Sequence, residues 1–423
     1  LLDGGDLTVN GSVDMNTGVT RGHLYVDSGT LFVSGNITLQ SFGVGDGTGS
    51  NGSYTFDTGA TLDNTGTFRV GRAGTGTFTQ DNGLVDISGN DINLGETSTG
   101  DGTYDINGGT LEVARDLRIG IAGVGLFRQD GGTVDVTRDV LLSQGNAVST
   151  LDINPGYDFI IGRDLVIGGA ANDGTVNQDG SAVTIGRNLV FGAAANQEGG
   201  TYNLNGGTLQ VDGNILETAG TDSAQLHIDG GTLTVDGNIT VQRLAVGEKS
   251  NTTGDYTLPD GQAIVSTGTT SIGASGTGEL NLTGVGSSLS SSNAVVGERD
   301  PGGSPRGDGT VLIDNGATWT VTQFLRIGDA GTGKVEINSG TLDVLGSSGS
   351  TRGIILGDDA GGVGELIIGT VGGSGTADPV ANNSGGNFET ALTGKGTVTM
   401  QNGQLNVLTN NLIVGQNATS EAL

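Results

Sequence analysis

Short runs in which apolar and polar residues alternate recur along most of the chain. In the stretch 102–120, three such runs cover 103–106, 110–113 and 117–119. Strict alternation of this kind is typical of a β-strand that buries one face. Turn-forming residues lie between the runs, and Gly120 closes the stretch. Each copy of the pattern therefore predicts one turn of a β-solenoid, built from three strands.

Copies of this stretch start at intervals of mostly about 23 to 26 residues along the sequence. Leucine-rich repeats have similar lengths, but their fixed Leu/Asn signature is absent from this sequence. The predicted fold is all-β: a single-stranded parallel β-helix, or β-solenoid, of about 15 three-strand rungs of roughly 24 residues each.

The domain prediction is one continuous β-solenoid over 1–423, because a repeat protein extends its core along one dimension. Within it we expect regular repeats over 1–240 and irregular repeats with corner loops over 241–423. Such insertions commonly carry binding, although surface corners also simply tolerate them. The segments expected as corner loops are 242–253, 298–308 and 370–395.

A second rhythm, two rungs long, runs through the residues 76–229. At the end of the first strand, Gln-Asp pairs alternate with Ile-Asn or Leu-Asn pairs. The glutamines occupy the phase of buried isoleucines, so we predict that they point inward and bond the corner backbone, since an unpaired buried amide costs about 1 to 3 kcal/mol. The glutamines are Gln80, Gln129 and Gln178.

The alternation of Asp and Asn at the following position has two interpretations. Interposed asparagines separate like charges and can form a ladder through their amides. Alternatively, the alternation records duplication and has no energetic role. The residues are Asp81, Asn107, Asp130, Asn154, Asp179 and Asn205.

Four arginines recur at the second corner of successive repeats, each beside an acidic or amide residue. We expect a solvated salt-bridge ladder, and the alternative is a site for an anion or a glycan. The arginines are Arg115, Arg138, Arg163 and Arg187, beside Asp116, Asp139, Asp164 and Asn188.

Composition narrows the classes of partner. The formal net charge of −29 should repel phosphate backbones, so no nucleic-acid partner is expected. No apolar run is long enough to cross a membrane, so no membrane insertion is expected. The absence of cysteine excludes disulfides and thiolate chemistry.

The sequence offers no catalytic constellation, so we expect no catalytic residues and no enzymatic activity. The two histidines, His23 and His227, lie about nine repeats apart. Outward carboxylates recur because the unit repeats, so any pair of them would be an arbitrary choice. Trp319 stands at the position of Leu111, which favours a place in the core over a sugar-stacking role.

Two acidic segments are candidates for binding Ca²⁺, because hard cations prefer several oxygens on a flexible loop. They contain Asp46, between two glycines, and the pair Asp358 and Asp359. The nonapeptide calcium pattern is not met at 361–366. No cofactor other than this Ca²⁺ is expected.

The unit Gly-Thr-Tyr-Asn-Leu-Asn-Gly-Gly-Thr-Leu-Gln-Val-Asp-Gly-Asn-Ile at 200–215 resembles the β-strand repeats of bacterial autotransporter passengers and related large surface proteins. The resemblance covers almost the whole chain. It implies a right-handed β-helix, secretion by a bacterium to the extracellular space or cell surface, and an adhesive or scaffolding role.

We therefore expect a non-catalytic extracellular structural protein, a subunit of a filament or surface layer assembled by end-to-end stacking of solenoids. Repeats run almost from the first residue to Val414, and open strand edges at both ends would let copies of this chain join head to tail. The alternative is that the chain is a fragment of a longer rod. The residues expected at this contact are Leu7, Val9, Leu412 and Val414.

The alternative function is an adhesin or glycan-binding surface module that uses the loops of the C-terminal half. Its partner would be a glycan or a surface receptor. A polysaccharide-cleaving enzyme is the third candidate.

Overall fold

The computed structural model shows an all-β protein, a parallel β-solenoid of about 15 turns, which confirms the predicted fold class. Its described part contains strands and no helix, and hence no helix long and apolar enough to cross a membrane. The described residues are 1–15, 22–169, 173–195, 197–220, 223–298, 306–346, 352–369, 380–384, 387–390, 394–408, 411–414 and 421–422.

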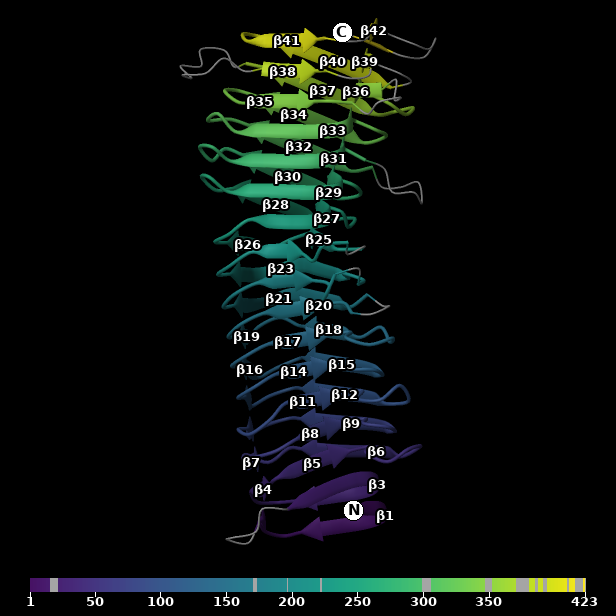
Figure 1. Cartoon of the computed structure of the whole chain (residues 1–423), viewed down its shortest axis with the longest axis vertical. Helices are drawn as coiled ribbons and strands as arrows, with labels where there is room; N and C mark the ends of the chain where they lie inside the picture. Colours follow the sequence, from purple (N-terminus) through teal and green to yellow (C-terminus); the bar gives the residue numbers. More distant parts are fainter. Residues whose placement is uncertain are drawn as a thin grey trace. The chain divides into compact units, whose positions relative to one another are not determined.

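The chain divides into two compact units. Unit 1 comprises Leu1–Ala224 and Thr234–Gly237, and unit 2 comprises Gln225–Leu233 and Asn238–Leu423. Within each unit the strands lie one above the other, from purple to teal in unit 1 and from teal to yellow in unit 2 (Figure 1). The prediction of one continuous solenoid concerns both units together and stays a prediction.

Strands from successive repeats of unit 1 pair in parallel and form three stacks. The first stack holds β6 (Asn51–Phe56), β9 (Thr75–Gln80), β12 (Asp101–Ile106), β15 (Val124–Gln129), β18 (Thr150–Ile153) and the first halves of β21 (Thr175–Ile185) and β23 (Thr201–Val211). The second holds β7 (Thr61–Asn64), β10 (Leu84–Ile87), β13 (Thr110–Val113), β16 (Thr133–Val136), β19 (Asp158–Ile161) and the second halves of β21 and β23.

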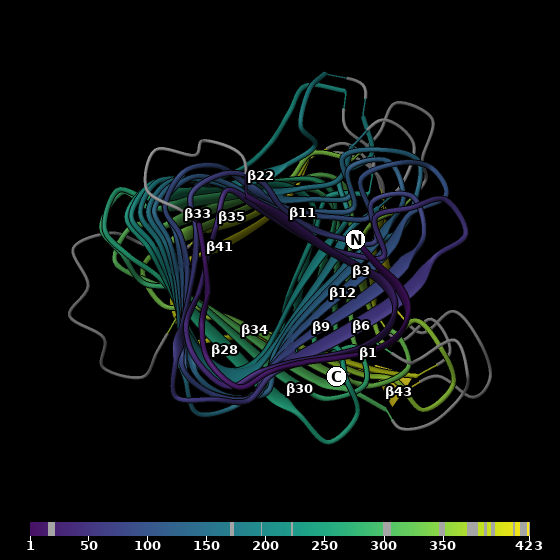
Figure 2. The ribbon, with the colours of Figure 1, turned by 90° about the horizontal axis from the view of Figure 1, so that it is seen from below.

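The third stack of unit 1 holds β8 (Phe68–Val70), β11 (Ile92–Leu94), β14 (Leu117–Ile119), β17 (Val140–Leu142), β20 (Leu165–Ile167), β22 (Leu189–Phe191) and β24 (Ile215–Glu217). Seen along the stack, the strands lie on three sides of the core (Figure 2). β26 (Thr232–Val235) contains residues of both units.

Alternation along each strand builds the core, as predicted. Tyr104, Leu111 and Leu117 represent the three stacks, and all three side chains are fully buried. Successive turns place aromatic rings on one another: the ring centroids of Tyr104 and Phe127 lie 5.2 Å apart. Trp319 is also fully buried, which confirms its predicted place in the core.

Glycine follows most third-position strands of unit 1, where the backbone is left-handed, and Ser143, after β17, adopts the same left-handed backbone with a φ of +56°. Gly95, after β11, has a φ of +60°. A Cβ at this position would lie 2.1 Å from the carbonyl oxygen of Val124 on the next turn. Glycine accommodates both the dihedral and the close approach at Gly95, so much of the glycine content reflects such corners.

Near its start, unit 1 has one strand more than a regular repeat, namely β5. Its first strands are β1 (Leu2–Val9), β2 (Val13–Asp14), β3 (His23–Val33), β4 (Ile37–Leu39) and β5 (Ser41–Val44). β5 follows β4 after one residue and pairs with the first half of β3, from His23↔Ser41 to Val26↔Val44. β4 comes third in its repeat, yet it pairs with the second-position strand β7. The repeat positions therefore move on by one face here.

Unit 2 begins in the same way. Its first strands are β25 (Gln225–Ile228), β27 (Ile239–Val246), β28 (Thr253–Leu258) and β29 (Ala263–Ile272). The second half of β27 pairs with β25, and β28 opens a separate seven-stranded sheet. The loop expected at 242–253 is therefore wrong for its first five residues, because Leu244 and Val246 are apolar and fully buried.

The seven-stranded sheet continues from β28 with β30 (Thr277–Leu282), β32 (Asp308–Ile313), β34 (Thr332–Ile337), β37 (Val363–Ile368), β40 (Lys395–Met400) and β43 (Glu421–Ala422). The other two stacks share the long strands β29, β31 (Ser288–Val296) and β33 (Thr318–Ile327). They continue as β35 (Thr341–Val344), β38 (Val380–Asn383) and β41 (Gln404–Val407), and as β36 (Arg352–Leu356), β39 (Asn387–Thr390) and β42 (Leu412–Val414).

Two of these strands fall where a loop was expected. β38 and β39 lie inside the segment 370–395, so that expectation is wrong for both of them. The reason is that Ala381 and Phe388 continue the apolar columns and are fully buried. The remaining expected loop, 298–308, lies largely outside the described residues.

Candidate functional site

The three predicted glutamines lie inside unit 1 and are fully buried. Each side-chain Nε2 donates to one carbonyl of its own corner and one of the next turn. The acceptors are Gly83 (3.3 Å) and Thr110 (2.9 Å) for Gln80, Gly132 (2.9 Å) and Asp158 (3.1 Å) for Gln129, and Ser181 (2.8 Å) and Thr208 (2.9 Å) for Gln178. The predicted inward orientation and backbone bonding are confirmed.

The acceptor side of these glutamines differs from turn to turn. The hydroxyl of Tyr104 donates to Oε1 of Gln80 at 2.7 Å, and the equivalent Tyr202 donates to Oε1 of Gln178 at 2.6 Å. Burial raises the pKa of both tyrosines well above the ordinary value, so both hydroxyls remain protonated donors.

Gln129 has no such donor. Leu151 takes the tyrosine position in the following turn, because it pairs with Phe127 as Tyr104 pairs with Phe78. Oε1 of Gln129 is buried and accepts no hydrogen bond. One turn of the ladder therefore carries an unsatisfied buried oxygen.

On the outside of unit 1, asparagine amides bond the aspartates of the preceding turn. Nδ2 of Asn107 donates to Oδ1 of Asp81, and Nδ2 of Asn205 to Oδ1 of Asp179, both at 2.7 Å. Asn154 donates to Asp130 in the same way. Each carboxylate thus accepts an N–H from the next turn. An aspartate in place of the asparagine would instead put a second carboxylate about 4.8 Å away. The predicted amide contacts are confirmed, and an energetic role for the alternation stays a prediction.

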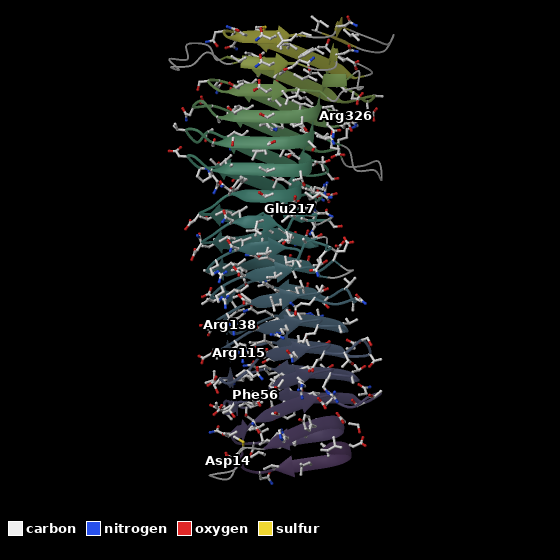
Figure 3. The ribbon with its side chains drawn as sticks, viewed as in Figure 1. Asp14, Phe56, Arg115, Arg138, Glu217 and Arg326 are labelled. Atoms are coloured by element: carbon white, nitrogen blue, oxygen red, sulfur yellow. The ribbon has the colours of Figure 1, made fainter. Side chains whose placement is uncertain are left out.

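The corner arginines form the predicted salt-bridge ladder. Each guanidinium reaches the carboxylate of the preceding turn, at distances from 3.0 Å to 3.5 Å. Arg115 and Arg138 lie on neighbouring turns at one edge (Figure 3). Their side chains are 45% and 37% exposed, so each pair contributes little stability by itself. The pairs are Arg115–Asp91, Arg138–Asp116, Arg163–Asp139 and Arg187–Asp164.

The Ca²⁺ candidates lie beside arginines. Oδ1 of Asp46 is 3.0 Å from Nε of Arg72, and Oδ2 of Asp358 is 3.0 Å from Nε of Arg326. The backbone N–H of Asp359 donates to the carbonyl oxygen of Asp329 on the preceding turn. Across the described ranges, no three His, Cys, Asp or Glu side chains gather in a way that could hold a metal ion. The Ca²⁺ prediction stays a prediction.

Asp329 belongs to the same corner of unit 2 as Asp358. Burial raises its pKa to about 6; Arg326 opposes this shift, whereas Asp358, Asp359 and Glu298 add to it. This carboxyl is therefore partly protonated in mildly acidic solution. It is the one acid of that corner with so large a shift among the residues described.

The predicted assembly residues lie on strand edges. Leu7, in β1, is 42% exposed, and Leu412, in β42, is 58% exposed, whereas Val9 is partly buried. β1 pairs only with β3, and β42 only with β39, among the described strands. The side chain of Val414 lies outside the described residues. A role in assembly stays a prediction for all four.

The chain also contains a long internal repeat that the 24-residue period does not reveal. Residues 1–56 align without a gap with 203–258, and 23 of the 56 positions are identical. The structures of the two copies agree, since His23↔Ser41 in one corresponds to Gln225↔Arg243 in the other. Comparing the chain with itself at an offset of 202 residues reveals this repeat.

The two copies also share a capping aspartate, which is half-buried in the first copy (Asp27) and buried in the second (Asp229). Oδ1 of Asp27 accepts the backbone N–H groups of Asp46 (2.7 Å) and Gly47 (3.1 Å). Oδ1 of Asp229 accepts those of Glu248 (2.6 Å) and Lys249 (2.9 Å). The aspartate fixes the corner that follows the extra strand in each unit.

No protein-family model, no curated protein and no solved structure matches this chain.

Proposed function

We propose that this chain is a non-catalytic structural protein, a subunit of a filament or surface layer in which solenoids stack end to end. The observation that carries the proposal is the use of the polar columns of unit 1. The Gln, Asn–Asp and Arg–Asp columns each bind the neighbouring turn. The residue types best suited to chemistry are thus engaged in holding turns together.

Assembly is supported by the strand edges. β1 and β42 each leave one edge unpaired among the described strands, and a free edge readily pairs with another strand. Leu7 and Leu412 add exposed apolar side chains at these edges. Two different surfaces that join make a heterologous contact, which continues into a filament when it does not close.

The proposed location is the bacterial cell surface or the extracellular space, as in the autotransporter-like proteins that the repeat resembles. A net charge of −29 keeps such a protein soluble and favours neither nucleic acid nor an anionic membrane as a partner. The proposed partner is another copy of the chain. Much of the loop sequence that an adhesin would use, including 299–305 and 370–379, lies outside the described residues.

Analytical ultracentrifugation tests the proposal. The wild-type chain is expected to form species of increasing mass with concentration, and Leu7→Asp or Leu412→Asp should leave monomers with unchanged β-sheet circular dichroism. The matched control is Ile160→Asp, on an exposed apolar residue in the middle of unit 1. Wild-type protein that stays monomeric at high concentration overturns the proposal.

A further inference from the structure

The interior of unit 1 contains a complete example of one rung seated on another. β23 and β24 pair with β21 and β22 in the register Val183↔Leu209, Ile185↔Val211 and Leu189↔Ile215. All six side chains are at most 1% exposed.

The upper rung of this example recurs at the start of unit 1. In the ungapped alignment, Leu7 corresponds to Leu209, Val9 to Val211 and Val13 to Ile215. The exposures differ, however: Leu7 is 42% exposed and Leu209 is fully buried. The difference arises because β21 covers the edge of β23, whereas the corresponding edge of β1 has no described partner.

The lower rung of the example recurs in β40, β41 and β42. Gly-Thr-Val occurs at 396–398 and at 174–176, and Asn-Leu at 411–412 and at 188–189. In this alignment Leu405, Val407 and Leu412 take the places of Val183, Ile185 and Leu189. Leu412 is 58% exposed and its counterpart is fully buried.

We propose that β40–β42 of one copy bind β1 and β2 of a second copy in the register of the internal example. The pairs are then Leu405 with Leu7, Val407 with Val9, and Leu412 with Val13. This inference rests on the proposed end-to-end assembly and specifies the surfaces and the register through which it occurs.

The polar pairs created by this register are compatible with a strongly acidic chain. Asp6 faces Gln404 and Thr8 faces Asn406, so these outward positions oppose no two carboxylates. Asp3 takes the place of Asn205, and Gln401 the place of Asp179, which Asn205 bonds in the internal example. An amide again faces a carboxylate, but here the amide belongs to the lower rung and the carboxylate to the upper rung.

The end of unit 2 leaves room for the incoming strand. β43 pairs with β40 only at Lys395 and Gly396. In the proposed register the first described contact of β1 is Leu2 opposite Met400, because Gln178 pairs with Leu204 in the example. Met400 is 50% exposed, and the incoming strand would cover it. β43 and β1 therefore use separate parts of the same edge.

Introduced cysteines test the register, since the chain has none of its own. Opposed residues of neighbouring parallel strands lie about 4.8 Å apart, which is within the Cα range of a disulfide. We expect Thr8→Cys/Asn406→Cys to form covalent dimers and longer ladders on oxidation, seen on a non-reducing gel. Thr184→Cys/Gln210→Cys, the same register inside one chain, should instead give a cross-linked monomer.

A shifted pair and a charge exchange complete the test. Thr8→Cys/Gln404→Cys is displaced by two residues and should yield several-fold less cross-linked product. Leu7→Glu and Leu405→Lys should each abolish polymers when alone, and an equimolar mixture of the two variants should restore them.

The outcomes separate this inference from the proposed function. Cross-linking that favours the shifted pair, or no recovery in the mixture, overturns the register while wild-type polymers leave end-to-end assembly standing. Wild-type protein that sediments as a monomer overturns both.

Discussion

Gln80 and Gln129 occupy the same position in two turns of unit 1 and bond equivalent backbone carbonyls, yet only Gln80 has its side-chain oxygen satisfied. Each glutamine Nε2 donates to corner carbonyls, and these acceptors recur in every turn because they belong to the repeating backbone. The glutamine Oε1 accepts a hydrogen bond only where the following turn supplies a donor. Tyr104 supplies one to Gln80, whereas Leu151 supplies none to Gln129. A repeat thus transmits backbone contacts more faithfully than side-chain contacts.

Replacing each glutamine by methionine should produce the largest difference in stability between the two turns. Gln80→Met strands the buried hydroxyl of Tyr104 and removes one hydrogen bond from the carbonyls of Gly83 and Thr110, so we expect the free energy of unfolding of the surrounding structure to fall by about 3 kcal/mol. Gln129→Met also removes an oxygen that has no partner, and should cost about 1 kcal/mol. Denaturant unfolding of both variants measures the difference.

A double variant provides the control. Tyr104→Phe removes the hydroxyl that Gln80→Met would strand, so Gln80→Met/Tyr104→Phe should be more stable than the sum of the single effects predicts. Equal losses for Gln80→Met and Gln129→Met would contradict the role assigned to the tyrosine.

Alkaline pH distinguishes turns with a tyrosine from the turn without one. The folded-state pKa of Tyr104 and Tyr202 is raised by burial, so their contribution is fully present below pH 10 and is lost as the pH rises above it. The loss approaches about 1.4 kcal/mol per pH unit for each tyrosine. Thermal unfolding of Tyr104→Phe/Tyr202→Phe should depend less steeply on pH between 10 and 11 than that of the wild type. An unchanged slope would count against buried, neutral hydroxyls.

A substitution at Leu151 can supply the hydrogen-bond donor that Oε1 of Gln129 lacks. Leu151→Tyr and Leu151→Phe both enlarge a fully buried side chain and cost packing energy. Only the tyrosine can donate to Oε1 of Gln129, so we expect it to be more stable than the phenylalanine by about 1 kcal/mol. In a Gln129→Met background this advantage should disappear. If it persists there, the hydroxyl acts through another contact.

The smallest effect is expected in the outer ladder. Asn107→Asp replaces the amide that donates to Asp81 and places a charge between two aspartates. We expect a loss of about 0.5 kcal/mol at low salt, because exposed charges interact weakly. Ser250→Asp, on an exposed corner of unit 2, is the control for added charge alone. A loss that does not shrink in 1 M salt would argue against repulsion as the cause.

The sequence contains enough information to predict the solenoid, the buried glutamines and the outer ladders, because each depends on the phase of a residue within one repeat. Gln80 could be placed inside because it shares the phase of Ile106. The bond from Tyr104 could not be predicted in this way, since it joins different positions of two turns. The extra strand at Arg243–Val246 could not be predicted from the repeat, because it has no counterpart in a regular repeat.

The alternation of glutamine with isoleucine or leucine bears on how such a chain finds its fold. A repetitive sequence can pair a strand with the wrong copy during folding, and neighbouring repeats offer nearly equivalent partners. Slippage by one turn in the stretch 76–229 would bring a hydrocarbon to the place of an amide and leave buried carbonyls without a donor. Slippage by two turns preserves the alternation of glutamine with isoleucine or leucine, although it can bring Leu151 to the place of Tyr104. We therefore infer that the glutamines disfavour pairing that is shifted by one turn during folding.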